Sequence, residues 1–216
     1  MPNTILPNTN LQQVHDPNVI KVVVMGVEST GKTTLCQDLA TAYDTTWVVE
    51  YMRPYLKQKW QTPEGRLAGI GYDDLLPIAK GQIHAENQAT AQLAKQASHN
   101  NKNHAAKLPL FCDTCLFELM VYAHWHQGRC PSKLKQAALS HRYDMVLLTK
   151  LDVPWQADGI RDSPYERNAI HDVFVTALNT YGIDYRMIGG GRDERVTQVK
   201  KWLSHQALLG VCQLCQ

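Results

Sequence analysis

A strand-like run, a glycine-rich loop and a helix-like run follow one another near residue 20, and this order constrains the fold more than any other feature of the chain. Residues 20–25 (IKVVVM) are short, apolar and β-branched, which favours a buried strand. Residues 26–33 have the sequence GVESTGKT, and residues 32–43 carry apolar side chains at helical spacing. A phosphate-binding loop needs these flanks, because its backbone N–H groups and the first helical turn together form the anion site. The sequence therefore predicts a P-loop at residues 26–33.

The residue types in this loop indicate how it would hold a nucleoside triphosphate. Glycines allow the backbone torsions that turn several N–H groups inward. Lys32 is expected to bridge the β- and γ-phosphates, and the Thr33 hydroxyl is expected to bind Mg²⁺. The residues that we expect to contact the nucleotide here are Gly26, Glu28, Ser29, Thr30, Gly31, Lys32, Thr33 and Thr34.

Further apolar runs of strand length alternate with helix-like segments along the rest of the chain. The runs are residues 46–49, 108–112, 145–148 and 185–188, and the longest helical stretch is residues 73–97. Strands that alternate with helices indicate a parallel sheet, because each parallel connection needs a crossover. We therefore predict an α/β P-loop NTPase fold, with a five-stranded, mainly parallel sheet, helices on both faces and a lid segment.

Charge and hydropathy argue against two classes of partner. The chain has 22 Lys and Arg against 20 Asp and Glu, so there is no positive excess to follow a nucleic acid backbone. Charges interrupt every apolar run well before the roughly 20 residues that span a bilayer. The first 19 residues match neither a signal peptide nor a transit peptide. We expect a cytoplasmic protein, with no nucleic acid partner and no membrane insertion.

Six cysteines are expected to be reduced thiols in that compartment. Cys112 with Cys115 and Cys212 with Cys215 have the two-residue gap of a four-thiolate zinc site. Zinc is the less favoured interpretation, because the first pair lies in a segment to which another role is assigned below and the second lies at the end of the chain.

Polar side chains follow the predicted strands, at the edge of the sheet where ligands of such folds lie. Glu50 and Arg53 follow the second strand, and a ribose hydroxyl would fit beside them. Asp113 ends the third strand, which suits coordination of Mg²⁺ through water. Glycines followed by Arg192 come after the fifth strand, where backbone approach to adenine is expected. The simpler alternatives are a helix cap for each carboxylate and a plain turn for the glycines.

A GTPase is the first rival to a kinase. Thr149-Lys-Leu-Asp152 is similar to the GTPase element whose carboxylate recognises the guanine base. Leu116, however, occupies the place where a GTPase has the glycine that senses the γ-phosphate. We therefore interpret Lys150 and Asp152 as loop residues, and keep a GTPase- or ATPase-type nucleotide switch as an alternative.

Four motifs in order resemble the ribosylnicotinamide kinase domain of NadR-type proteins, within the P-loop kinases. They are GVESTGKTT at 26–34, EYMR at 50–53, DT at 113–114 and PWQADGIR at 154–161. The resemblance covers roughly residues 20–205. It implies transfer of a phosphoryl group from ATP, with Mg²⁺, to the 5′-hydroxyl of nicotinamide riboside, which yields nicotinamide mononucleotide for NAD salvage. A kinase of another nucleoside is the alternative within this class.

The resemblance assigns roles to individual residues. Glu50 is expected to orient or deprotonate the 5′-hydroxyl, with Asp113 as second choice for that role and first choice for the metal. Members commonly have another acidic residue after Asp-Thr; Cys115 stands there, so Asp113 is expected to be the only carboxylate for this role. The expected catalytic residues are Lys32, Glu50, Asp113 and Arg161, and the expected substrate contacts are Glu50, Tyr51, Arg53, Tyr55, Trp155 and Asp158; Arg192 is expected at the nucleotide.

The charged, proline-containing segment 152–167 is expected to form a lid. Arg161 would reach the γ-phosphoryl group only when the lid closes, and so would act on the transition state more than on ATP binding. Trp155 is expected either to lie on the nicotinamide ring or to anchor the lid by packing. An ordinary charged surface loop is the plainer alternative.

Domain organisation follows from the same resemblance. We expect a flexible leader at residues 1–19, a kinase domain at residues 20–207 and a tail at residues 208–216. No His-x-x-His nucleotidyltransferase element precedes the P-loop, so we expect a stand-alone kinase without the adenylyltransferase domain of bifunctional members.

Overall fold

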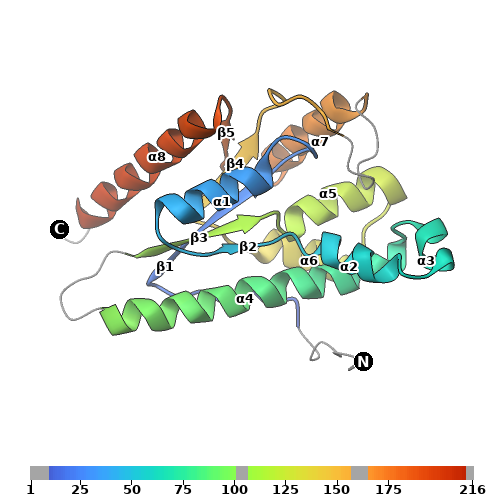
Figure 1. Cartoon of the computed structure of the whole chain (residues 1–216), viewed down its shortest axis with the longest axis horizontal. Coiled ribbons are helices and arrows are strands. Elements are labelled where there is room, and N and C mark those ends of the chain that lie inside the picture. Colours follow the sequence, from blue (N-terminus) through green and yellow to red (C-terminus); the bar gives the residue numbers. More distant parts are fainter. Residues whose placement is uncertain (1–9, 101–106, 157–164, 213–216) are drawn as a thin grey trace.

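The computed structural model describes residues 10–100, 107–156 and 165–212. Strands and helices alternate along most of this chain (Figure 1). The elements are β1 (Val19–Met25), α1 (Lys32–Ala42), β2 (Trp47–Val48), α2 (Met52–Lys59), α3 (Pro63–Ala68), the 3-10 helix η1 (Tyr72–Asp74), α4 (Leu75–Asn100), β3 (Leu108–Asp113), α5 (Leu116–Gln127), α6 (Ser132–Ser140), β4 (Met145–Thr149), α7 (Arg167–Thr180), β5 (Arg186–Ile188) and α8 (Arg192–Cys212).

The described strands form one parallel sheet in the order β2-β3-β1-β4-β5. β1 lies in the middle, where Val22 pairs with both Phe111 of β3 and Met145 of β4. The predicted five-stranded parallel sheet is confirmed. Its central strand is apolar at nearly every position because both of its faces are covered.

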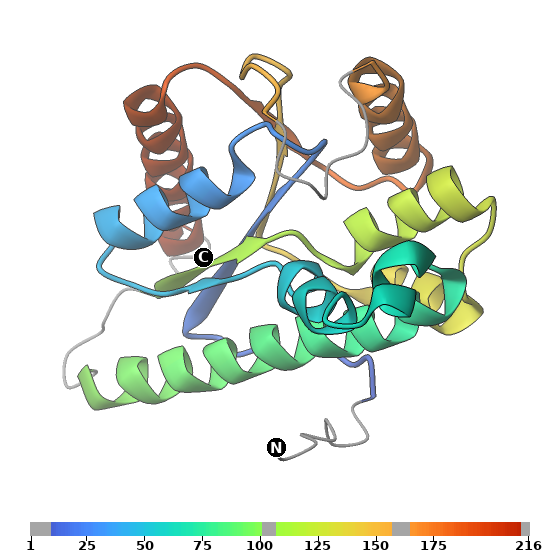
Figure 2. The same ribbon diagram turned by 45° about the vertical axis from the view of Figure 1, so that its right-hand side comes forward.

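Successive residues of β1 serve two separate hydrophobic cores, as the two-residue period of a strand requires. Val22 and Val24 pack with α1 and α8 on one face, whereas Val23 and Met25 pack with α4, α5, α6 and α7 on the other. Figure 2 shows the sheet between these two groups of helices. Helices on both faces of the sheet therefore fix the position of β1, and the glycine loop that follows Met25 is held at the end of this strand.

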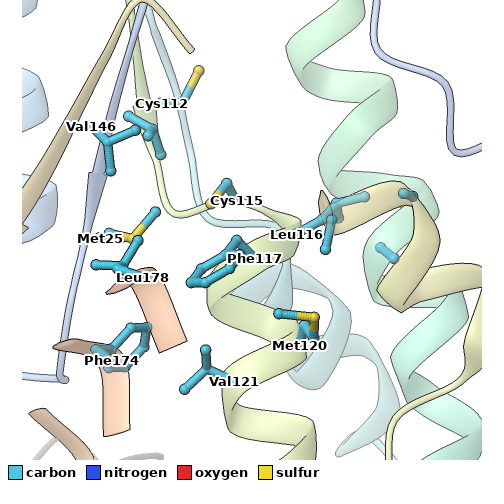
Figure 3. Packing of buried hydrophobic residues seen from close by; sticks show 14 of the residues in the cluster. Met25, Cys112, Cys115, Leu116, Phe117, Met120, Val121, Val146, Phe174 and Leu178 are labelled. Atoms are coloured by element: carbon cyan, nitrogen blue, oxygen red, sulfur yellow. The ribbon is translucent and has the colours of Figure 1, made fainter. Parts of the chain in front are cut away.

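The packing of α5 fixes the position of its first turn at the carboxyl edge of the sheet. Phe117 and Val121 of α5 point into the core that also contains Met25 of β1, together with Phe174 and Leu178 of α7 (Figure 3). All five side chains are at most 3% exposed. Residues on the neighbouring face of α5 are thereby held in place beside the P-loop.

Two predicted elements have different bounds in the structure. The run at 46–49 forms only the two-residue strand β2, which pairs with β3 alone and leaves Val49 half exposed. The stretch at 73–97 begins as the 3-10 helix η1 and continues as α4 to Asn100. Pro77 lies in the first turn of α4, where the missing N–H costs no helical hydrogen bond.

A buried ion pair ties the segment before β1 to α4. Lys21 of β1 and Glu86 of α4 are each 1% exposed, and Lys21 Nζ lies 2.8 Å from Glu86 Oε1. The ammonium group also donates to the carbonyl oxygen of Val14 at 2.5 Å. Gln13 Nε2 and the Tyr143 hydroxyl donate to the two oxygens of Glu86 at 2.6 and 2.8 Å. Residues 10–18, part of the predicted leader, thus contact the domain through a fully hydrogen-bonded carboxylate.

Within the described ranges, no helix is long and apolar enough to cross a membrane.

Candidate active site

The loop between β1 and α1 has the backbone torsions that its glycines allow. Gly26 has φ +136° and Gly31 has φ +82°, a region that other residues rarely adopt. A Cβ atom on Gly26 would lie 2.4 Å from Thr149 Oγ1, so the close approach of β4 also requires glycine there. Ser29 takes φ +57° without being glycine, which is backbone strain of the kind that gathers at functional sites.

Lys32, the first residue of α1, has its side chain folded back onto this loop. Its Nζ donates to the carbonyl oxygens of Gly26 at 2.7 Å and Val27 at 3.2 Å. It also lies 3.3 Å from Glu118 Oε1. Burial by itself would lower the pKa of Lys32, but Glu118 and the nearby carboxylates Glu50 and Asp113 together raise the pKa above its usual value. The lysine is therefore a protonated cation surrounded by carboxylates.

Thr33 and Asp113 meet at the mouth of the loop. The Thr33 hydroxyl donates to Asp113 Oδ2 at 2.6 Å. Asp113 is 1% exposed, and its burial raises the pKa of its carboxyl group, which Lys32 partly offsets. Its other oxygen, Oδ1, is buried and has no hydrogen-bond partner among the described residues. A hydroxyl and a carboxylate with a spare oxygen are the hard oxygen ligands that suit Mg²⁺.

Glu50 and Arg53 form an ion pair at the start of α2. Arg53 Nε lies 2.9 Å from Glu50 Oε2, and the Glu50 side chain is 15% exposed. Both residues line the same cavity as the P-loop. The arginine therefore holds the carboxylate at the cavity wall.

Tyr51 and Tyr55 connect α2 to its neighbours. The Tyr51 backbone N–H donates to Gln82 Oε1 of α4 at 2.7 Å, and its ring packs so closely on Gly81 that a Cβ atom there would clash with it. The Tyr55 hydroxyl donates to Asp74 Oδ1 at 2.6 Å. Neither tyrosine lines the cavity in this structure. These contacts hold α2 in position, and with it the Glu50–Arg53 ion pair at its start.

One cavity of about 680 Å³ runs from the P-loop to a chamber between α2, α4 and α5. The chamber walls are apolar and aromatic, and Tyr122 stacks on His126 with ring centroids 5.7 Å apart. The chamber residues are Met52, Leu56, Trp60, Ile70, Leu75, Ile78, Leu119, Tyr122, Ala123 and His126. The phosphate end and the apolar end are thus two parts of one space, with Glu50 on its wall.

Glu118 is a further residue of this site that was not expected from the sequence. It lies in the first turn of α5, 4% exposed, and its Oε2 accepts a hydrogen bond from the Gly26 N–H at 3.0 Å. Burial raises the pKa of Glu118 to about 7. Asp113 is therefore not the only carboxylate that approaches Lys32. The sequence signal for this residue is its place in the first turn of the helix that follows β3. That turn lies at the same edge of the sheet as the end of the strand.

Several expected site residues lie elsewhere or outside the described residues. Arg192 Nε bonds to Asp38 Oδ2 of α1 at 2.9 Å, and the arginine side chain is 72% exposed and does not line the cavity. Trp155 is half-buried and also does not line it. Asp158 and Arg161 fall outside the described residues, as does half of the expected lid. The described start of that segment contacts the P-loop, because the Gln156 N–H donates to Ser29 Oγ at 2.8 Å.

Asp152, the residue in the guanine-reading position, is engaged by the protein itself. Its Oδ2 accepts from the Gly190 N–H at 2.6 Å, and its Oδ1 pairs with Arg195 of α8. Arg195 Nη1 in turn donates to the Thr30 carbonyl oxygen at 2.7 Å. Asp152 therefore links the ends of β4 and β5 to the P-loop, which supports its interpretation as a loop residue.

Cys112 and Cys115 are buried in the core beside the sheet. Burial raises the pKa of Cys115 to about 12, so its thiol is protonated. The described ranges hold no group of three or more His, Cys, Asp or Glu side chains placed to bind a metal ion, and Cys215 falls outside them.

The sequence of the chain matches one family model and is similar to curated proteins. The family model described as "AAA domain" matches residues 21–195. Two curated relatives are the "Trifunctional NAD biosynthesis/regulator protein NadR" of Salmonella typhimurium strain LT2 and of Escherichia coli strain K12, 28% and 27% identical over 166 residues. The match covers 76% of this chain and 37% of each relative, so the chain spans little more than a third of their length.

Two solved structures share the fold. A crystal structure of NadR protein in complex with NR has a TM-score of 0.61 and 21% identity, and the match covers 82% of this chain and 45% of that one. Thymidylate kinase from Ehrlichia chaffeensis has a TM-score of 0.53 and 14% identity, with 87% of this chain and 100% of that chain covered. The fold is therefore that of the P-loop kinases.

Proposed function

We propose, from the premise that the chain belongs to the AAA domain family matched over residues 21–195, that it phosphorylates the 5′-hydroxyl of nicotinamide riboside with ATP. The chain is a P-loop kinase related to NadR. One observation carries the choice of acceptor class: a single cavity joins the P-loop to an apolar, aromatic chamber with the Glu50 carboxylate on its wall. A phosphate donor and a nucleoside acceptor would fit the two ends of that space.

The donor end supports a triphosphate. Lys32 supplies a cation, and Thr33 and Asp113 are the residues that would hold Mg²⁺. Bound there, Mg²⁺ would neutralise charge on the phosphate oxygens. The buried Oδ1 of Asp113, which lacks a hydrogen-bond partner among the described residues, supports this assignment.

The acceptor end supports a riboside with a cationic base. Trp60 and Tyr122 both line the chamber, and aromatic faces attract a fixed positive charge such as that of the nicotinamide ring. Glu50 lies on the wall, held by Arg53 at 2.9 Å. In this proposal Glu50 accepts the proton of the 5′-hydroxyl as its oxygen attacks the γ-phosphorus, and the bond to the β-phosphate oxygen breaks to release ADP.

Arg161 would complete the stabilisation of the transferring group in this proposal. Charge spreads over the γ-phosphoryl oxygens during transfer, so positioning and cationic groups supply most of the rate enhancement. Asp158 and Trp155 are assigned to the acceptor side of the same lid. These three roles rest on the sequence motif at 154–161.

A coupled assay of ADP release with Mg-ATP tests the proposal. The acceptors compared are nicotinamide riboside, adenosine, cytidine, uridine, thymidine and no acceptor. We expect turnover that depends on nicotinamide riboside, with nicotinamide mononucleotide as the product identified by mass. Turnover without any acceptor would instead indicate a nucleotide switch, and preference for another nucleoside would overturn the choice of acceptor.

Asp113→Asn and Glu50→Gln are expected to affect the reaction in different ways. The Asp113 change removes a metal ligand, so the magnesium concentration for half-maximal rate should rise severalfold. The Glu50 change removes the proton acceptor, so turnover at saturating magnesium should fall by about a hundredfold or more. Magnesium titrations of both variants measure the difference, with Asp193→Asn on the exposed first turn of α8 as the charge control. If the two patterns were exchanged, the two roles would be exchanged with them.

A further inference from the structure

Glu118 occupies a position that the proposed chemistry does not use. Its carboxylate is buried in the first turn of α5 and bridges two parts of the P-loop. Oε2 accepts from the Gly26 N–H at 3.0 Å, and Oε1 lies 3.3 Å from Lys32 Nζ. One side chain from outside the loop thus contacts both its first glycine and its lysine.

The ammonium group of Lys32 is held by three partners in this arrangement. A lysine ammonium has three N–H donors. Lys32 Nζ donates to Gly26 O at 2.7 Å and Val27 O at 3.2 Å, and it forms an ion pair with Glu118 Oε1 at 3.3 Å. To contact a phosphate oxygen, Lys32 must therefore give up one of these partners. An anionic phosphate most directly replaces the anionic partner, which is Glu118.

The geometry indicates which of the two side chains moves. Glu118 is anchored by its bond to Gly26, and its helix is packed into the core through Phe117 and Met120 (Figure 3). Lys32 has a long, flexible stem that can turn toward the cavity that it lines. When Lys32 turns, Glu118 stays buried without its ionic partner, so the favourable pairing of the two side chains is lost on nucleotide binding.

We propose that Glu118 is a positioning residue that holds Lys32 on the nucleotide-free loop and competes with nucleotide phosphate for its ammonium group. This inference rests on the proposed nucleotide-binding function and adds to it a device that limits affinity. Because Glu118 weakens the hold of Lys32 on both ATP and ADP, it also favours release of the product nucleotide.

Calorimetric titration with ADP in the presence of Mg²⁺, and with tripolyphosphate as a probe without base or ribose, tests this competition. Glu118→Gln keeps an acceptor for the Gly26 N–H but removes the charge, and it should tighten binding of both probes about tenfold. Glu118→Asp, which withdraws the carboxylate by one methylene, should tighten binding less. Glu64→Gln on the exposed surface of α3 removes the same charge elsewhere and should leave both affinities unchanged.

A double-mutant cycle separates competition for Lys32 from simple repulsion of phosphate. In a Lys32→Met background the Glu118→Gln change should lose its effect, because no ammonium group remains to be released. Equal tightening in both backgrounds would show direct repulsion and overturn the proposal, as would unchanged or weaker binding in Glu118→Gln alone. If the unmodified protein bound neither probe, the proposed function would fail first and this inference with it.

Discussion

Lys32→Ala is expected to lower the rate of phosphoryl transfer by at least about a hundredfold, equivalent to roughly 3 kcal/mol of transition-state stabilisation. The substitution removes a protonated amine that is surrounded by Glu118, Glu50 and Asp113 and that lines the proposed phosphate end of the cavity. The coupled assay at saturating ATP measures the loss. Lys57→Ala, on an exposed position of α2, serves as the control and should retain full activity.

Loss of activity in this variant needs to be separated from loss of the fold. Removing Lys32 leaves the buried carboxylate of Glu118 without its ionic partner, which is itself destabilising. The double variant Lys32→Ala/Glu118→Gln removes that charge and should remain folded by circular dichroism while staying inactive. Unchanged turnover in a folded Lys32→Ala protein would contradict the P-loop assignment.

Glu86→Leu is expected to lower the free energy of unfolding by about 3 to 5 kcal/mol, the usual cost of breaking a buried ion pair from one side. The substitution leaves the Lys21 ammonium buried, with the Val14 carbonyl as its remaining hydrogen-bond partner among the described residues. It also removes the acceptor for Gln13 and for the Tyr143 hydroxyl. Urea unfolding followed by tryptophan fluorescence measures the change.

A matched pair of variants tests whether the charge, and not the volume, is responsible. Lys21→Met/Glu86→Leu removes both charges and should recover much of the lost stability, because apolar side chains of similar size tolerate this environment. Glu64→Gln, exposed on α3, should change the unfolding free energy by less than about 0.5 kcal/mol. A loss below about 1 kcal/mol in Glu86→Leu would show that water already reaches the pair.

The elements predicted best from the sequence are those specified by local pattern. The strand-loop-helix order around Gly26 and the four further apolar runs gave the parallel sheet, because strand length and flanking breaks are encoded within a few residues. Glu50 and Asp113 were expected at one edge because the carboxyl ends of parallel strands share it, and both carboxylates do act on Lys32 in the structure. Their catalytic roles stay predictions.

What the sequence did not predict depends on pairs that are distant in the chain. Lys21 and Glu86 are 65 positions apart, and Asp152 and Arg195 are 43 apart, so no local pattern marks either pair. Arg192 contacts Asp38 of α1, a partner that only the packing of α8 beside α1 reveals, and its expected place at the nucleotide stays a prediction. Glu118 has the appearance of an ordinary acidic residue in a first helical turn, and only the fold shows that it faces the P-loop.

The central place of β1 has a consequence for synthesis of the chain. Both strands that pair with β1, namely β3 and β4, come more than 80 residues later, and translation proceeds at about 5 to 20 residues per second. The apolar run Val19–Met25 is therefore without its partner strands for seconds during synthesis. Short, β-branched segments of this kind are prone to aggregate. Lys21 is the one charge in that run, and a charge within an apolar segment opposes self-association. In the folded structure Glu86 of α4 pairs with that same charge, so a lysine that opposes association of the exposed strand is also accommodated in the core.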